Sequence, residues 1–507
     1  MEIIAVTVVS FLVFVYAVVK LVRCGNESSQ NEIPGPKKLP VIGNLHLLAG
    51  GSLPHRVFRD LAAKYGPLMR LQLGQIPFLI VSSVEVAKQV VRSHDVVFAN
   101  RIPMLAAITI SYNYHDIVVA PYGEHWRQLR RICTLELLSS RRVKSFRAIR
   151  EEENSKLAHL IASNAGLPAN VSESVQKSAF EIITRSAVGS QAPDKAAKFT
   201  WAIQETVKLG SGLCIADLFP SNKLLPTISG MNYKIAKIFR VTDDILQSII
   251  DRHRAATAND DVMMESGSED LVDVLLKYQQ DDSLQVQITT ETIKAVILDI
   301  LIGGSDTSAT TVGWAMSEMI RNPITLKRAQ EEVRQVLDDK GYVDEEKFAE
   351  MKYFNLVIKE TLRLHPPLPL LMPRMSSEGC EIKGYKIAGG SRVMINAWAL
   401  GRDPTYWDEA EKFKPERFEK SSSIDFKGNN LEYIPFGSGR RICPGISMGV
   451  VNVEFTLATL LYHFDWEMPH GIKNEDLDMT EAFGAFVKRK YDLLLIPTLR
   501  RPLSHLQ

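Results

Sequence analysis

The chain has 507 residues, of which 45% are apolar and 23% charged, and its net charge is +1. This is the composition of an ordinary globular protein, and it gives no indication of a nucleic-acid or polyanionic partner. The five cysteines are odd in number, widely spread and without a CxxC pair. That pattern argues against a disulfide framework or a clustered zinc site and suits a reducing compartment.

The first apolar stretch, Ile3–Val22, reads "IIAVTVVSFLVFVYAVVKLV" and carries one charge, at Lys20. A helix needs about 20 mostly apolar residues to cross a bilayer. A cleaved signal peptide is the alternative, but that segment has a basic start, whereas this chain begins with Glu2 and its basic residues follow the apolar run. We predict an uncleaved anchor in residues 1–23, with the rest of the chain in the cytosol because the positive charges lie on that side.

The segment Ile33–Asn44 reads "IPGPKKLPVIGN" and holds three prolines within seven residues. Prolines fix φ and remove backbone donors, so such a segment is stiff and extended. We predict a proline-rich hinge in residues 24–45 that spaces the folded body from the membrane.

The body, residues 46–507, contains no internal repeat and no second linker, so we predict one large domain. Alternating residues in Leu68–Ser82, with Gly74 at the turn, predict a β-hairpin. Helical patterns dominate after it, so the predicted fold is mainly α with a small β portion. The predicted helices are Ser139–Ala162, Tyr233–Ala256, Thr292–Arg321, Pro323–Asp339 and Phe348–Leu364, and strands are predicted in Tyr385–Val393 and Leu493–Pro497.

The stretch "FGSGRRICPG", Phe436–Gly445, places Cys443 beside two arginines in a glycine-rich loop. Nearby cations and converging backbone N–H groups stabilise a thiolate, and Arg440 and Arg441 are placed to do so. One isolated cysteine suits a single axial ligand, as in haem iron, where the porphyrin supplies four more ligands. The alternative is a structural cysteine in a phosphate-binding loop, but such a loop normally ends in Lys-Ser/Thr, which is absent here.

The same loop resembles the cysteine-ligand signature of the cytochrome P450 family at its defining positions, which are Phe436, Gly439, Arg441, Cys443 and Gly445. The wording of this and other motifs is most similar to plant microsomal monooxygenases of the 71 clan. The resemblance implies a cytochrome P450 fold preceded by a single N-terminal transmembrane helix. It also implies a haem b cofactor whose iron takes the Cys443 thiolate as its axial ligand, with Phe436 against the haem.

Two further motifs contain charged residues that the resemblance brings together. "KETLR" holds Glu360 and Arg363 three residues apart on one helix face, and "PERF" holds Arg417. Taken alone, the first two would form a solvated surface pair of little energetic value. In the family the three side chains form a buried fork-geometry network that supports the cysteine loop, so we expect structural support rather than chemistry from them.

The motif "GGSDTS", which begins at Gly303 and Gly304, interrupts an apolar helical run. Each glycine costs about 1 kcal/mol in a helix relative to alanine, and close helix packing is one reason to accept that cost. In the family this stretch crosses the distal face of the haem and opens locally. The resemblance implies that Thr307 holds a hydroxyl near dioxygen and that Asp306 feeds protons from solvent. Gly303 is often alanine in relatives, which predicts extra room above the iron here.

"WRQLR" places Trp126 and Arg130 one helical turn apart, so both can point at one target. In relatives these two positions bond a haem propionate, whereas Arg127 between them is expected to face solvent. The resemblance gives Arg441, and less directly Arg374, the same role.

The resemblance implies monooxygenation of a lipophilic substrate with dioxygen. No nicotinamide or flavin fingerprint is present, so the electrons are expected from a membrane-bound NADPH–cytochrome P450 reductase docked on the cysteine-loop face. The expected location is the endoplasmic reticulum membrane, single-pass, with membrane lipid around the anchor and the catalytic domain in the cytosol.

Substrate choice is expected in segments that the motifs do not fix. Their apolar side chains predict a pocket for a plant specialised metabolite, with a terpenoid favoured by analogy over an alkaloid or a phenolic. Each of these residues could equally fill the core. They are Met104, Leu105, Ile108, Ile110, Ile302, Leu368, Leu371, Phe483 and Phe486.

Two other functions remain as alternatives. One is a rearranging haem-thiolate enzyme that needs neither dioxygen nor a reductase, but such enzymes typically lack the distal threonine and carry an altered cysteine loop. The other is a membrane-tethered haem carrier or sensor, which would need neither a proton relay nor an apolar pocket. The presence of Thr307 argues against both.

Overall fold

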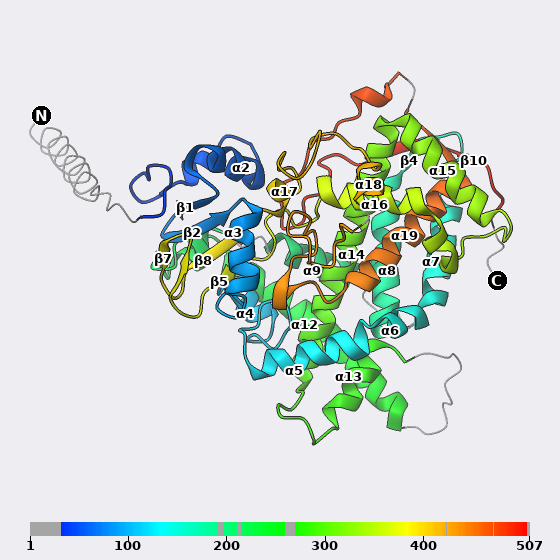
Figure 1. The fold of residues 1–507 in the computed structure, drawn as a ribbon. Helices are drawn as coiled ribbons and strands as arrows, with labels where there is room; N and C mark the ends of the chain where they lie inside the picture. The colour runs from blue at the N-terminus through cyan, green and yellow to red at the C-terminus, as the bar shows by residue number, and fades with distance from the viewer. Residues whose placement is uncertain are drawn as a thin grey trace, which may run out of the picture.

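A small β region lies beside a larger helical body in this computed structural model (Figure 1). The structure describes residues 32–189, 196–209, 214–258, 269–421, 423–469 and 471–503. The predicted membrane anchor in residues 1–23 falls outside the described residues. The prediction of a mainly α fold with a small β portion is confirmed.

The helical body is built from α-helices joined by short 3-10 and π-helical turns. The α-helices are α2 (Pro54–Tyr65), α3 (Val84–Lys88), α4 (Leu105–Ile110), α5 (Glu124–Ile132), α6 (Ser140–Ser145), α7 (Arg147–Ala162), α8 (Val171–Val188), α9 (Ala196–Leu209), α10 (Ile215–Leu218), α11 (Leu225–Ile228), α12 (Met231–Ala258), α13 (Leu271–Gln279), α14 (Thr290–Arg321), α15 (Pro323–Leu337), α16 (Lys352–Leu364), α17 (Ala397–Leu400), α18 (Arg417–Lys420) and α19 (Ile446–His463). The shorter turns are η1 (Leu45–Leu48), η2 (Gln89–Ser93), η3 (Cys133–Leu137), η4 (Glu345–Glu350), η5 (Gly439–Arg441) and η6 (Asn474–Asp476).

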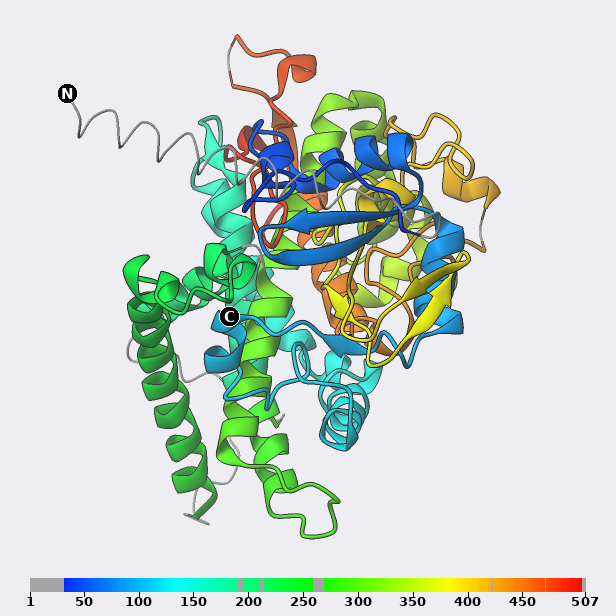
Figure 2. The same cartoon turned by 90° about the vertical axis from the view of Figure 1, so that its left-hand side faces the viewer.

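The strands form one five-stranded sheet in the order β1-β2-β8-β5-β3, a three-stranded sheet β4-β10-β9 and a two-stranded sheet β6-β7. Their bounds are β1 (Leu68–Leu73), β2 (Ile76–Val81), β3 (Asn100–Arg101), β4 (Ala169–Asn170), β5 (Arg374–Met375), β6 (Cys380–Ile382), β7 (Tyr385–Ile387), β8 (Arg392–Ile395), β9 (Phe464–Glu467) and β10 (Leu494–Leu499). In the view of Figure 2 the β1–β2 hairpin faces the viewer, and α12 runs alongside α14.

The predicted elements are largely present, with three changes at their boundaries. The strand-like run predicted in Tyr385–Val393 is two strands, β7 and β8, which belong to different sheets. The hairpin is confirmed, since β1 pairs antiparallel with β2 and Gly74 at the turn has φ +60°. The predicted helix Ser139–Ala162 is two helices, α6 and α7, because the backbone leaves the helical region at Phe146. The helix predicted from Phe348 begins only at Lys352, after the 3-10 turn η4.

The predicted spacer Ile33–Asn44 is not free of the body, because its backbone is bonded along β1. The amide of Arg70 donates to the carbonyl of Pro34 at 2.8 Å, and the amide of Asn44 donates to the carbonyl of Gln72 at 2.5 Å. These bonds hold the spacer against the edge of the five-stranded sheet. The stiffness expected from the prolines is therefore reinforced by pairing, and this part of the hinge belongs to the folded body.

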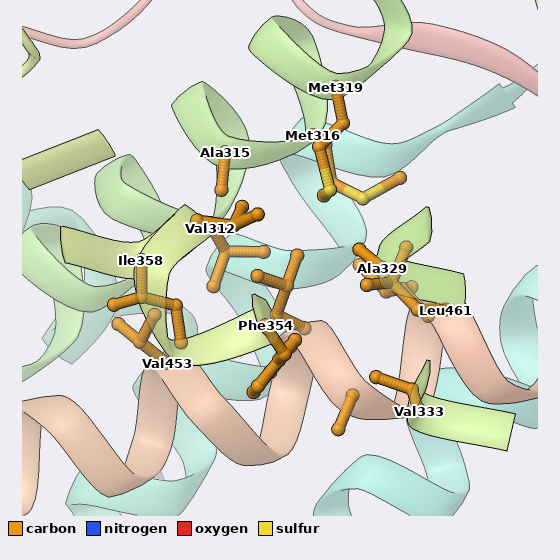
Figure 3. Close-up of a cluster of buried hydrophobic side chains, with 14 of the residues drawn as sticks. Val312, Ala315, Met316, Met319, Ala329, Val333, Phe354, Ile358, Val453 and Leu461 are labelled. Atoms are coloured by element: carbon orange, nitrogen blue, oxygen red, sulfur yellow. The ribbon is translucent and has the colours of Figure 1, made fainter. Parts of the chain in front are cut away.

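The core of the body is organised around α14, which is long and apolar enough to cross a membrane. The most apolar 18-residue stretch of this helix is 67% buried inside the fold, which is typical of a core helix. Figure 3 shows one hydrophobic cluster in which α14 meets α15, α16 and α19. The labelled members are Val312, Ala315, Met316, Met319, Ala329, Val333, Phe354, Ile358, Val453 and Leu461.

The two adjacent glycines of α14, Gly303 and Gly304, have different surroundings. A Cβ built on Gly304 would lie 2.7 Å from Cδ1 of Ile183 on α8, so this glycine permits the close approach of the two helices. A Cβ on Gly303 would meet nothing within 4 Å. Close helix packing therefore accounts for Gly304 alone, while Gly303 leaves open space on the other side of the helix.

Candidate active site

The loop that carries Cys443 is fixed by backbone contacts before α19 begins. The amide of Cys443 donates to the carbonyl of Phe436 at 2.9 Å, and Gly439 adopts φ +70°. A Cβ on Gly439 would lie 2.7 Å from the carbonyl oxygen of Val91, so only glycine allows this approach to η2. The amide of Arg440 donates to the Asp95 carboxylate at 3.0 Å. These contacts present the cysteine at the start of α19.

The charge that acts on Cys443 comes from Arg130, which corrects the expectation for Arg440 and Arg441. Burial raises the pKa of the Cys443 thiol, while the Gly445 N–H and the Arg130 guanidinium lower it. Arg440 instead lies 3.6 Å from Asp95, and Arg441 bonds carbonyl groups outside the loop. The loop alone therefore does not make a thiolate, whereas a bound metal ion deprotonates a coordinating thiol.

Four buried or half-buried arginines converge beside the cysteine loop and bond backbone carbonyls. Arg130 donates to Ile442 at 2.6 Å and Arg374 donates to Ser438 at 2.7 Å, both within the loop. The remaining contacts are Arg441 to Ala99 at 2.7 Å and to Ala120 at 2.5 Å, and Arg101 to Met372 at 2.8 Å. We call Arg101, Arg130, Arg374 and Arg441 the arginine cluster.

The arginine cluster carries positive charge that the nearby carboxylates of Asp95 and Asp116 offset only in part. Burial, together with the charges of Arg374 and Arg130, lowers the pKa of Arg441 to about 9, and burial also lowers the pKa of Arg101. Nη1 of Arg374 is buried without a hydrogen-bond acceptor among the described residues, although it lies 3.6 Å from Asp95. A buried donor without a partner is costly. An anionic ligand such as a pair of haem propionates would satisfy both the charge and this donor.

Trp126 and Arg130 lie on α5, one turn apart, as the spacing predicts. The indole N–H of Trp126 donates to the carbonyl of Ile117 at 3.0 Å, and the Arg441 guanidinium lies 4.2 Å from the centre of the Trp126 ring. Trp126 therefore packs against the arginine cluster, to which Arg130 belongs. Arg127, by contrast, is exposed and lies 3.9 Å from Glu124 of the same helix.

The distal motif lies on α14 across a small cavity from the cysteine loop. The cavity has a volume of about 30 Å³, and its lining joins Thr307 of α14 to Phe436 of the loop and to α19. The other lining residues are Ser308, Thr311, Ile358, Leu362, Pro367, Gly449, Val450 and Val453. The sequence motifs "GGSDTS" and "FGSGRRICPG" thus face each other across a mostly apolar space. Cys443 itself does not line this cavity. The Cys443 thiol, the arginine cluster beside its loop and the Thr307 hydroxyl of α14 are nevertheless groups of the kinds that would hold a haem.

Helix α14 is continuous through the motif, so the expected local opening is absent. The Thr307 hydroxyl donates to the carbonyl of Gly303 at 2.7 Å, and the Ser308 hydroxyl donates to that of Gly304 at 3.0 Å. Both hydroxyls find their acceptor within α14, and the helix stays continuous although such back-bonding slightly destabilises and often bends a helix. Asp306 turns to α8, where its carboxylate accepts a bond from Nε2 of Gln176 at 2.5 Å.

The structure brings Glu360, Arg363 and Arg417 into one buried network. Arg363 makes two bonds to the Glu360 carboxylate, at 2.7 and 2.8 Å, and Nε of Arg417 donates to it at 3.0 Å. The side chains of Glu360 and Arg363 are fully buried. The surface-pair alternative is therefore wrong for these two residues.

Edge-to-face contacts between aromatic rings connect this network to the cysteine loop. Arg363 lies 5.2 Å from the Trp407 ring centre, and Trp407 packs edge-on against Tyr433. Tyr433 contacts Phe426, which in turn contacts Phe436 at 5.4 Å between ring centres. Because Phe436 accepts the Cys443 amide, the packing path from the ion pairs to the cysteine is continuous.

The predicted pocket residues separate into two groups. Leu368, Leu371 and Phe483 line a cavity of about 70 Å³ between the 368–373 loop and the 483–487 turn. The other six predicted residues do not line it. Of these, Met104 is buried in the core beneath the sheet, Ile108 is exposed, and Leu105, Ile110, Ile302 and Phe486 are half-buried.

Three aspartates hold the segment 101–119, which includes α4. Asp217 of α10 accepts the amide of Leu105 at 2.7 Å, and Asp243 of α12 accepts the hydroxyl of Tyr112 at 2.9 Å. Asp299 of α14 accepts the amides of residues 117 and 118 at 2.9 and 3.1 Å. Burial and the neighbouring Asp116 raise the pKa of Asp299 well above its usual range. Three helices thus share in placing one pocket segment.

Several site residues were missed from the sequence. Arg101 belongs to none of the motifs, yet it completes the arginine cluster. Asp299 was hidden in an apolar run, where an isolated acid is itself a signal of a buried role. Gln176 had no local signal, because its contact is with a residue 130 positions away.

The chain is similar to known proteins over nearly its full length. The family model described as cytochrome P450 matches residues 33–496. Cytochrome P450 71D11 of Lotus japonicus is 50% identical, covering 94% of this chain and 97% of that protein. Premnaspirodiene oxygenase of Hyoscyamus muticus is 47% identical, covering 98% of each. A solved zebra fish cytochrome P450 structure with progesterone superposes with a TM-score of 0.75 at 21% identity, covering 88% of this chain and 100% of that chain.

The fold and the site define a haem-thiolate protein, in which a single cysteine loop faces a hydroxyl-bearing helix. With the family model matching most of its length, the chain belongs to the cytochrome P450 family. It is a monooxygenase, and its cofactor is a haem whose iron takes a cysteine thiolate. The predictions of family, enzyme class and cofactor are confirmed.

Proposed function

We propose that this enzyme oxygenates a lipophilic plant terpenoid, using dioxygen and electrons from an NADPH-dependent reductase. The observation that carries the substrate class is the likeness to plant enzymes named for such substrates, among them premnaspirodiene oxygenase and germacrene A hydroxylase of Barnadesia spinosa. An alkaloid is the second candidate, because tabersonine 6,7-epoxidase of Catharanthus roseus is similar to the same degree as the first of these. The apolar lining of both cavities supports a substrate of low polarity.

The roles of the chain's own residues in this reaction follow from their positions. When bound, the haem supplies the redox-active iron that activates dioxygen for insertion into a substrate bond. Cys443 would hold the iron. Electron donation from its thiolate would favour O–O cleavage. The arginine cluster would hold the propionates, and Trp126, whose indole N–H already bonds the Ile117 carbonyl, would support Arg441. The cavity wall of α14 would exclude bulk water and present the Thr307 hydroxyl among the lining groups.

Proton supply requires a route from solvent to the Thr307 hydroxyl. Asp306, the preceding residue, carries the carboxyl nearest in sequence, and its pKa is raised by burial. A raised pKa brings a carboxyl closer to the range in which it both takes up and releases protons. Asp306 would take up protons on the α8 side, and Thr307 would hold them at its Oγ1 on the cavity side.

The remaining partners rest on the sequence. The run Ile3–Val22 supports a single membrane anchor in residues 1–23, and the family wording supports an endoplasmic reticulum location with residues 46–507 in the cytosol. The cysteine-loop face is the proposed docking surface for the reductase, because the electrons are needed at the iron that Cys443 would hold. Membrane lipid and the reductase are thus the proposed partners.

The proposed function is tested with the full chain in microsomes that contain the reductase, supplied with NADPH and isotopically labelled dioxygen. The panel holds a terpenoid hydrocarbon, an alkaloid and a phenolic, and the product is identified by mass. We expect one labelled oxygen atom in the terpenoid product and none with the Cys443→Ser variant, which lacks the thiolate ligand. A product formed without NADPH, or without label, would instead establish a reductase-independent rearrangement.

A further inference from the structure

The carboxyl of Asp306 and the hydroxyl of Thr307 face different parts of the molecule. Successive residues of an α-helix are turned about 100° from each other. Thr307 lines the 30 Å³ cavity, whereas Asp306 faces α8 and bonds Gln176 there at 2.5 Å. The two groups are therefore the inner and outer ends of one route through α14. What surrounds the outer end decides how protons reach it.

Two groups outside α14 act on the Asp306 carboxyl. Gln176 of α8 donates its amide N–H, and Lys488 contributes a positive charge from the 480–490 hairpin. Both lower the pKa of Asp306, in opposition to burial. Lys488 is exposed and Gln176 is half-buried, so the order from solvent to the helix is lysine, amide and carboxyl.

The position of Lys488 is set by its two chain neighbours. Nε1 of Trp314 donates to the carbonyl of Val487 at 3.0 Å, and Nη1 of Arg489 donates to the hydroxyl of Ser317 at 2.9 Å. Both partners lie on α14, C-terminal to Asp306. The hairpin itself is closed by the bond from the Ala482 amide to the Lys488 carbonyl at 2.8 Å. The lysine is therefore held over the same helix face that carries Asp306.

We propose that Gln176 is a positioning residue for the proton route and that it holds the Asp306 carboxyl at the α8 side of α14. This inference rests on the proposed relay role of Asp306 and goes beyond it by assigning the residue that orients the acid. The bond from Nε2 of Gln176 fixes one carboxyl oxygen of Asp306 on the α8 side of the helix. Loss of the donor frees the carboxyl to rotate and favours its neutral form.

The experiment compares Gln176→Met and Gln176→Glu in the full-length, haem-loaded enzyme. Both substitutions keep the approximate length of the side chain, and both remove the amide donor. We expect the product formed per NADPH consumed to fall about three- to tenfold in each, less than the roughly 10² to 10⁴-fold effect of a direct general acid. Peroxide should rise in proportion, while NADPH consumption, haem content and substrate binding stay near normal. The exposed neighbour variant Lys177→Met is the matched control on α8.

A second measurement does not depend on turnover. The carbonyl stretching band of a protonated carboxyl is followed against pH by infrared spectroscopy and assigned to Asp306 with the Asp306→Asn variant. Because Gln176 and Lys488 both lower the pKa of Asp306, Gln176→Met and Lys488→Met should each keep this band to higher pH than the unmodified enzyme. Lys490→Met, an exposed lysine on the same hairpin, should leave the band unchanged.

The two measurements separate this inference from the relay itself. If Asp306→Asn reduces coupling but both Gln176 variants keep normal coupling and an unshifted band, the positioning role is wrong and the relay stands. If Asp306→Asn leaves coupling unchanged, the relay is wrong, and the infrared titration still decides whether Gln176 controls the carboxyl. Loss of folding in Gln176→Met alone leaves the decision with Gln176→Glu. Loss of folding in both would make Gln176 a packing residue and overturn the proposal.

Discussion

At the scale of single residues, the site is defined by where polar atoms find partners. Arg374 retains a buried donor without an acceptor, and Thr307 uses its hydroxyl on the preceding turn of its own helix. These are opposite situations. The arginine needs a ligand to complete its bonding, whereas the threonine is satisfied and can hand over its proton only by exchanging a bond of about 1 kcal/mol. The arginines at the rim of the cofactor site therefore favour an anionic ligand, whereas the Thr307 hydroxyl above the cavity does not require one.

Thr307→Ala tests the inner end of the proton route. Alanine is the better helix former, so folding and haem content should be preserved. We expect the product formed per NADPH consumed to fall by about tenfold or more, because one proton-carrying group is lost. The measurement is product, NADPH and peroxide in the same reaction.

Ser305→Ala is the matched control for this substitution. Ser305 lies on the same helix and makes the same kind of back-bond, to the Leu301 carbonyl at 2.7 Å, but it is buried away from the cavity lining. It should leave coupling unchanged. Equal coupling losses in both variants would mean that the effect comes from the helix rather than from the hydroxyl.

At the scale of elements, α14 combines two functions that place different demands on adjacent positions. Gly304 faces α8 and permits close packing, while Gly303 faces open space. A larger residue at position 304 would displace Ile183 or push α14 away from α8. A Cβ added at position 303 would meet no protein atom within 4 Å.

Gly304→Ala and Gly303→Ala form a matched pair that measures this difference. The added methyl at 304 would overlap Ile183, and overpacking of this kind costs about 1–3 kcal/mol. At 303 the methyl would meet no protein atom within 4 Å. Thermal unfolding of the haem-loaded Gly304→Ala variant should thus occur at a lower temperature than that of Gly303→Ala. A lower melting temperature for Gly303→Ala than for Gly304→Ala would contradict the packing.

Elements were predictable where the pattern is local. The β1–β2 hairpin follows from alternation and one turn glycine, and α14 follows from its length and apolar run. The break at Phe146 between α6 and α7 left no mark in the helical pattern. The pairing of Pro34 with Arg70 was also invisible, because it depends on a strand more than thirty positions away. Long-range contacts are set by the whole fold and not by the segment.

The same division applies to the site. Cys443, Thr307 and the Glu360 network were found because their motifs are short and specific. The pocket residues were found poorly, since an apolar side chain has the same signature in a core as in a cavity. Of the nine predicted, Leu368, Leu371 and Phe483 line the larger cavity. Arg101 and Gln176 act through partners that sequence alone could not assign.

At the scale of the whole molecule, the buried ion pairs join segments that lie far apart in the sequence. Glu360 of α16 contacts Arg417 of α18, and the aromatic path leads from there to the cysteine loop. A change in this network should therefore be felt at the cofactor. Its energetic weight comes from burial, because exposed pairs of the same type contribute little.

Glu360→Ala tests this connection. It leaves Arg363 and Arg417 without their shared partner, and breaking a buried pair costs about 3–5 kcal/mol. We expect little haem-loaded protein, measured as the ratio of haem absorbance to protein. Glu419→Ala is the control, because Glu419 pairs with Arg328 at 3.0 Å and both side chains are about half exposed. A haem-replete Glu360→Ala protein would assign the network to local packing alone.

The arginine cluster has a consequence for the supply of the cofactor. Four like charges beside one another oppose folding of the empty chain, so the anionic ligand that neutralises them binds the folded form and not the unfolded one. By mass action, each tenfold rise of free haem above its dissociation constant adds about 1.4 kcal/mol to the stability of the fold. Haem binding should therefore raise the melting temperature of the enzyme, and this rise should grow with the concentration of free haem.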